Sequence, residues 1–219
     1  MGPDDYNAQE YEAGRLTPSM ITALVKEWQG EKGLQVDGKA GPRTQASLRR
    51  AAAGEDVASS PVGLLALAVA VESLGRGEEG GNNSGPFVET LHRLQWDGDD
   101  DDDGAWCAAF VSWCFEQAYE RASGIVPPMP FARSGGAKRL YRNIGNAGSF
   151  PAKPAPGDVV CWDRGKRGSW MGHVGFVERV EGEVIHTIEG NVGAFPSTVR
   201  RMVHDTSHRP PVGYARIKD

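Results

Sequence analysis

The sequence has little cysteine, no long apolar run and no excess of basic charge. Its 219 residues include three cysteines, none with CxxC spacing, which argues against a disulfide scaffold or a zinc site. The longest apolar run, Val62 to Val71, is about half as long as a membrane-crossing helix, so it predicts a buried helix and no membrane insertion. A net charge of −5 argues against nucleic-acid binding as the main role.

The N-terminus also lacks the basic and apolar regions of a signal peptide. We therefore expect synthesis in the cytoplasm, and a target outside the cell would be reached by lysis or a dedicated secretion route. An apolar fraction of 39% and a charged fraction of 24% are typical of a globular protein. The length fits one full domain and a small accessory one.

One of the cysteines stands where a helix is expected to begin. The segment ahead of Cys107 is almost entirely aspartate and glycine, and residues 108–121 contain neither glycine nor proline. A thiol in a first helical turn lies at the positive end of the helix dipole, which lowers its pKa and makes it reactive. Cys114, two turns further along, and Cys161, in an expected strand, are predicted to be core residues.

A histidine, an acid and an amide follow this cysteine in the chain. The order is that of a thiol hydrolase of the papain kind. Cys107 would attack a carbonyl carbon, His173 would accept and return the proton, and Glu189 would hold the imidazole. Asn191 would support this pair or polarise the oxyanion, to which the backbone N–H of Cys107 would also donate.

These roles require His173 and Glu189 to share one face of a sheet. Directly opposed residues of an antiparallel hairpin share a face, so we expect the two to be paired across a three-residue loop, 180–182. A two-residue turn at 181–182 would place their side chains on opposite faces. The remaining histidines are interpreted as structural (His186) or as surface residues (His92, His204 and His208).

The expected elements fall into two groups. Residues 1–14 are polar and aperiodic and predict a flexible arm, and residues 54–60 predict a linker. Residues 15–53 contain two helical segments, the first with Ile21, Leu24, Val25 and Trp28 at helical spacing. Residues 61–219 predict an α+β domain, with helices at 61–74, 86–96, 107–121 and 134–143, followed by antiparallel strands at 158–163, 172–180, 183–189, 197–204 and 212–217.

Residues 61–217 resemble the CHAP branch of the NlpC/P60 superfamily, the cysteine peptidases and amidases that cut peptidoglycan. This resemblance implies a papain-like fold with N-terminal helices and a C-terminal sheet, and hydrolysis of a murein amide bond by the cysteine with the histidine as base. No cofactor is expected to be required. The matching blocks are Trp106-Cys107-Ala108, Pro156-Gly157-Asp158, Gly172-His173-Val174-Gly175 and Glu189-Gly190-Asn191, and Gly81–Pro86 resembles a phage-type subset.

Residues 15–53 resemble the small three-helix peptidoglycan-binding domain of many cell-wall hydrolases, through Asp37-Gly38, Gly41-Pro42 and Thr44. An arbitrary helical hairpin is the alternative. Together the two resemblances imply a monomeric murein hydrolase of the endolysin or antibacterial-effector type. Peptidoglycan would be its substrate, and a holin, secretion machinery or an immunity protein would be its further partners.

Two other functions stay open. The same fold could act as an amidase or transferase on a soluble peptide conjugate, or the chain could be a wall-binding module without catalysis. The bond that is cut also stays open, because amidase cleavage next to muramic acid and endopeptidase cleavage within the peptides need the same thiol and base.

The aspartate-rich segment Asp97–Asp103 is a separate candidate. Asp99, Asp101 and Asp103 match the first half of a calcium loop, but Phe110 stands where the final glutamate should be. A solvated acidic loop is therefore favoured over a calcium site. Trp106 and Trp170 flank the expected cleft, either lining it or packing in the core.

Overall fold

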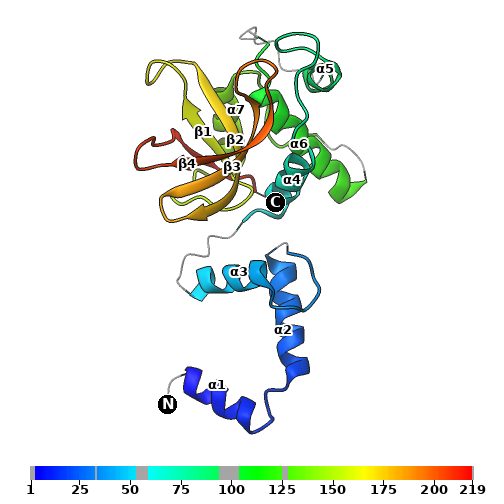
Figure 1. Cartoon of the computed structure of the whole chain (residues 1–219), viewed down its shortest axis with the longest axis vertical. Helices are drawn as coiled ribbons and strands as arrows, with labels where there is room; N and C mark the ends of the chain where they lie inside the picture. Colours follow the sequence, from blue (N-terminus) through cyan, green and yellow to red (C-terminus); the bar gives the residue numbers. More distant parts are fainter. Residues whose placement is uncertain (1–2, 33, 53–58, 94–103, 125–127, 219) are drawn as a thin grey trace. The chain divides into compact units, whose positions relative to one another are not determined.

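The computed structural model describes residues 3–32, 34–52, 59–93, 104–124 and 128–218, and the chain forms two compact units, residues 1–56 and 57–219 (Figure 1). The predicted linker at 54–60 lies mostly outside the described residues. None of the described helices combines the length and the apolar character that crossing a membrane requires.

The first unit contains three helices in its described part, α1 (Pro3–Glu12), α2 (Pro18–Glu31) and α3 (Pro42–Ala52). The flexible arm expected for residues 1–14 is thus largely a helix. It lacks apolar periodicity, which is why the sequence does not predict it, but Pro3 stands at the first helical position, where proline is favoured. The three-helix domain expected within 15–53 has two helices in its described part, with α1 preceding them.

A buried glutamine joins these helices. Gln29 Nε2 donates to Asp37 Oδ1 at 2.9 Å and to Thr44 Oγ1 at 3.1 Å, while Gln29 Oε1 accepts from the backbone N–H groups of Asp37 and Gly38. The Asp37-Gly38 turn is therefore tied to the end of α2 and the start of α3. The apolar side chains expected to pack on α2 are not all covered, since Leu24 is 57% exposed.

The second unit is built on a five-stranded antiparallel sheet in the order β4-β3-β2-β1-β5. All five strands lie close to their predicted positions. Strand β1 and the central parts of β2 and β3 are buried at nearly every residue, because both faces of the sheet are covered there. The strands are β1 (Val159–Asp163), β2 (Gly172–Glu181), β3 (Val184–Val192), β4 (Thr198–Asp205) and β5 (Gly213–Ala215).

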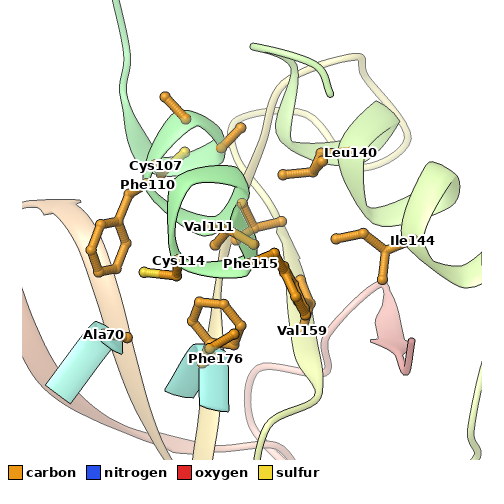
Figure 2. Packing of buried hydrophobic residues seen from close by; sticks show 14 of the residues in the cluster. Ala70, Cys107, Phe110, Val111, Cys114, Phe115, Leu140, Ile144, Val159 and Phe176 are labelled. Atoms are coloured by element: carbon orange, nitrogen blue, oxygen red, sulfur yellow. The ribbon is translucent and has the colours of Figure 1, made fainter. Parts of the chain in front are cut away.

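In the described part of the second unit, four helices accompany the sheet: α4 (Pro61–Glu72), α5 (Pro86–His92), α6 (Cys107–Ser123) and α7 (Ala137–Ala147). Of these, α4, α6 and α7 pack on the sheet, and their apolar side chains form one core with Phe176 and Val159 (Figure 2). A smaller cluster around Trp162 covers part of the opposite face. This architecture is α+β, as expected. Helix α7 begins three residues later than predicted, because Ser134 Oγ accepts from the Gly136 N–H and forms a turn there.

Candidate active site

Cys107 is the first residue of α6, as the sequence predicts. Helix α6 has no side-chain cap, and its first-turn N–H groups have no carbonyl partner within the helix. Cys107 is nevertheless only 3% exposed, and Figure 2 shows it beyond Phe110 at the end of the core cluster, while Cys114 lies deeper among the aromatic rings. Cys114 and Cys161 are fully buried, which confirms their core assignment.

A buried carboxylate fixes the residue before Cys107. Glu78 Oε1 accepts from Trp106 Nε1 at 3.3 Å and from the Asn83 N–H at 2.9 Å, and Glu78 Oε2 accepts from the Ser197 N–H at 2.7 Å. Burial opposes the charge of Glu78, but these N–H donors outweigh it and lower the pKa of Glu78. Trp106, which is fully buried, is therefore a core residue that anchors the start of α6, not a cleft-lining one.

His173 and Glu189 form the buried polar centre of the sheet. His173 Nε2 lies 2.9 Å from Glu189 Oε2. The other oxygen, Glu189 Oε1, accepts from Thr187 Oγ1 at 2.5 Å and lies 2.6 Å from His204 Nε2. Because every carboxylate oxygen has a partner, Glu189 can stay ionised although it is only 2% exposed.

The register that joins them differs from the prediction. Glu181 pairs with Val184 across a two-residue loop, so the expected three-residue loop is wrong. This loop alone would turn His173 and Glu189 to opposite faces. A β-bulge between Val177 and Arg179 adds one residue, so that Phe176 pairs with Ile188 and the two functional side chains share a face as diagonal neighbours.

Two glycines of the sequence motifs make room for this arrangement. A Cβ on Gly175 would lie 2.5 Å from Glu189 Cγ, so only glycine lets the glutamate side chain pass over β2 toward His173. A Cβ on Gly190 would lie 2.7 Å from the ring of Trp106, so this glycine lets β3 approach the start of α6. The motif residue Asp158 stabilises another part of the unit, because its carboxylate accepts two hydrogen bonds from Arg216 and so joins β1 to the C-terminal segment.

The thiol and the imidazole are electrostatically linked. Burial opposes ionisation of Cys107, but the positive charge of His173, its hydrogen bond and the charge of Arg164 together lower the pKa of this thiol. Burial likewise opposes the charge of His173, but the Cys107 thiolate and Glu189 outweigh it and raise the pKa of His173 to about 9. The pKa of Glu189 is lowered despite burial by its bonds to the two histidines. The site therefore favours a thiolate–imidazolium pair.

Arg164 is a site residue that sequence reasoning missed. Its Nη2 lies 2.9 Å from His173 Nδ1 and donates to the Asn191 carbonyl at 3.5 Å. No spacing pattern marks it, because only the β1–β2 hairpin, in which Trp162 pairs with His173, brings the following loop back to the imidazole.

The structure places the remaining predicted residues as follows. Asn191 lies next to the site in a left-handed conformation, but its Oδ1 accepts from Ser197 Oγ at 3.0 Å. His204 is 9% exposed and contacts Glu189 and the Trp162 ring, so its assignment as a surface residue is wrong. His186 contacts Arg179 and Glu181, away from the site. The Asp97–Asp103 segment lies outside the described residues, and the residues that are described contain no cluster of three or more metal-ligating side chains.

Comparison with known proteins gives one match. Residues 99–191 match the CHAP domain family, and this range contains Cys107, His173 and Glu189. CHAP domains are generally cysteine- and histidine-dependent amidases or peptidases, so the match supports a CHAP-domain protein of a peptidoglycan hydrolase or amidase family. No curated protein and no solved structure matches the chain.

Proposed function

We propose that the second unit is a papain-like cysteine hydrolase that cleaves an amide bond of peptidoglycan. The observation that carries this proposal is the chain of contacts from Cys107, at the start of α6, through the buried His173 to the buried Glu189. Nucleophile, base and orienting group thus stand in the order that thiol catalysis needs.

The geometry supports a division of roles. His173 Nε2 faces Glu189, so Nδ1 is the nitrogen left to take the Cys107 proton. The thiolate then attacks the amide carbon, and the first-turn N–H groups of α6 stabilise the oxyanion. His173 returns its proton to the leaving amine, and a water molecule, deprotonated by the same imidazole, hydrolyses the thioester.

Two neighbours complete this mechanism. Arg164 can donate to Nδ1 only while the imidazole is neutral, and once Nδ1 carries the proton the charge of Arg164 favours the thiolate. Asn191 acts by positioning in this proposal: its carbonyl accepts from Arg164, and its side chain binds Ser197. A direct action of the Asn191 side chain on the imidazole or the oxyanion stays a prediction.

The first unit is proposed to bind the cell wall, which would make the whole chain a murein hydrolase of the endolysin or antibacterial-effector type. This proposal is supported by the Asp37-Gly38 turn and Thr44, the residues that carry the sequence resemblance, which are all held by Gln29. Sedimentation of the full-length Cys107→Ala protein with purified sacculi tests it, because binding can then be measured without digestion.

Digestion of purified sacculi tests the enzymatic proposal. The wild type should release soluble fragments, whose masses identify the bond that is cut, and Cys107→Ala should lower the rate by about 10⁴-fold or more. Cys114→Ala is the matched control, because it removes a buried thiol from the same helix outside the contact chain. Equal turnover by wild type and Cys107→Ala would reject the thiol mechanism. Addition of EDTA to the same assay tests the aspartate-rich segment, where an unchanged rate is expected.

A further inference from the structure

A basic pocket lies beside the proposed catalytic centre, between the exposed side of α7 and the β1–β2 loop. Its volume is about 390 Å³. The segment that contains most of its lining is basic, in contrast to the chain as a whole. Residues 138–172 contain seven basic and two acidic side chains, whereas the net charge of the protein is −5. The pocket is lined by Gly136, Lys138, Arg139, Arg142, Gly168, Ser169 and Trp170.

One wall of this pocket is held in place by Lys138. This residue is 8% exposed, and its Nζ donates to Asp163 and to the Ser169 carbonyl. Lys138 therefore fixes the loop, and its charge is offset by Asp163. Arg139 and Arg142, three residues apart on an exposed face of α7, line the pocket with their guanidinium side chains. Trp170, which is 62% exposed, adds an aromatic surface.

The pocket is joined directly to the catalytic elements. A Cβ on Gly172 would lie 2.7 Å from Lys138 Cγ, so the lysine stem packs against the residue before His173. The β1–β2 loop that carries Ser169 and Trp170 also carries Arg164, which bonds to the His173 ring. A ligand in the pocket would thus lie on the loop that touches the imidazole.

We propose that this pocket is a substrate subsite that binds a carboxylate of the peptide flanking the scissile amide, through Arg139 and Arg142, with Trp170 packing on the adjacent part of the peptide. Guanidinium groups pair with carboxylates in a bidentate manner, and an aromatic ring covers the apolar part of a peptide at low entropic cost. This inference rests on the proposed function for its choice of ligand, since peptidoglycan stem peptides carry free carboxylates.

Peptide binding to the full-length Cys107→Ala protein tests the subsite without turnover. Two probes are compared by calorimetry: a synthetic stem tetrapeptide with free carboxylates, and the same peptide with its carboxylates converted to carboxamides. The carboxylate peptide should bind about tenfold more tightly. The additional Arg139→Gln and Arg142→Gln pair should abolish this difference without changing the affinity for the carboxamide peptide, and Arg142→Gln alone should weaken binding about threefold, as expected for an exposed ion pair.

Matched variants identify the role of the arginines. Arg142→Lys should restore part of the affinity, whereas Lys153→Gln, an exposed cation outside the pocket, should leave it unchanged. Equal binding of the two peptides, no measurable binding of either at millimolar concentration, or an unchanged affinity in the double variant would overturn the proposal. Displacement of the peptide by inorganic phosphate at equal concentration would also overturn it, in favour of a general anion site.

The enzymatic proposal fails separately. If wild-type protein leaves sacculi intact while the peptide discrimination holds, the subsite stands and the hydrolase does not. If sacculi are digested and the arginine variants show the wild-type KM, the hydrolase stands and the subsite does not.

Discussion

The two units bury different kinds of side chain. In the described part of the first unit, the buried side chains are polar, namely Gln29, Thr44 and Ser47, while Met20 and Leu24 are half exposed or more. In the second unit, an apolar core formed by α4 to α7 and the sheet accompanies a buried polar network centred on Glu189.

This difference separates two uses of a buried hydrogen-bond network. Gln29 holds a turn to two helices, and its bonds replace apolar packing as the link between them. Glu189 lies in a unit that is already held by its core, so its bonds can serve chemistry by orienting His173. Replacement of Gln29 should therefore lower the stability of the first unit, whereas replacement of Glu189 should lower the activity of the second.

Among the changes that compare the two units, the largest effect is expected for Glu189→Gln. The amide cannot stabilise an imidazolium as a carboxylate does, so kcat on sacculi should fall by about 10² to 10⁴-fold. Turnover is measured by fragment release, and far-UV circular dichroism reports whether the fold is kept. Glu183→Gln, an exposed change in the turn of the same hairpin, is the control and should keep wild-type activity. A Glu189→Gln protein that is folded and fully active would remove Glu189 from the mechanism.

Phe115→Ala tests the apolar half of the comparison. Phe115 is fully buried, with its ring 5.4 Å from those of Phe131 and Phe176. Truncation should lower the free energy of unfolding of the second unit by about 3–5 kcal/mol, through lost burial and the cavity left behind. Denaturant unfolding of the full chain measures this change. Val203→Ala, at a side chain that is 61% exposed, should change it by less than about 0.5 kcal/mol.

The sequence predicts local features of the second unit well. The start of α6 at Cys107 and the positions of the five strands follow from helix formers, breakers and segments rich in strand-forming residues, all of which are encoded within a few residues. The close approach of Cys107 and His173 agrees with the family resemblance, which supplies a spatial relation that periodicity alone does not contain.

Relations between strands and loops could not be predicted in the same way. The two-residue hairpin loop by itself would place His173 and Glu189 on opposite faces of the sheet, and the bulge at Glu178 returns them to one face. The expected three-residue loop therefore predicts the correct shared face from an incorrect pairing of residues. His204 reaches the site because β4 pairs with β3, and Arg164 reaches it because the loop after β1 turns back toward His173. Neither contact leaves a pattern in the sequence. In the first unit, apolar spacing along α2 predicts burial, but Leu24 stays exposed because the contacts between α2 and α3 are made by polar groups.

Gln29→Ala tests the polar half of the comparison. The change leaves the N–H groups of Asp37 and Gly38 without their acceptor and should destabilise the first unit by about 2 kcal/mol. Hydrogen exchange of the peptides that cover residues 28–45 should accelerate, while exchange in α6 and β2 stays unchanged. Glu27→Ala, at an exposed position on α2, serves as the control. Equal acceleration of exchange in both units would contradict the prediction that the Gln29 network stabilises the first unit alone.

The smallest effect is expected for Arg164→Gln. Loss of the guanidinium removes one of the charges that lower the pKa of Cys107, so alkylation of the thiol by iodoacetamide at pH 7 should slow by about threefold. Lys153→Gln, which removes an exposed charge from the same unit, should leave the rate unchanged.

The pH dependence of the same unit follows from the raised pKa of His173. The stability gained by protonating this histidine is fully present below its ordinary pKa of 6.5 and should be lost as the pH rises through about 9. Turnover should fall over the same alkaline range, because the leaving amine then lacks its proton donor. Parallel measurements of turnover and thermal unfolding from pH 6 to 10 check this expectation. An alkaline limit that stays unchanged in Glu189→Gln would contradict it, because that carboxylate contributes to raising the pKa of His173.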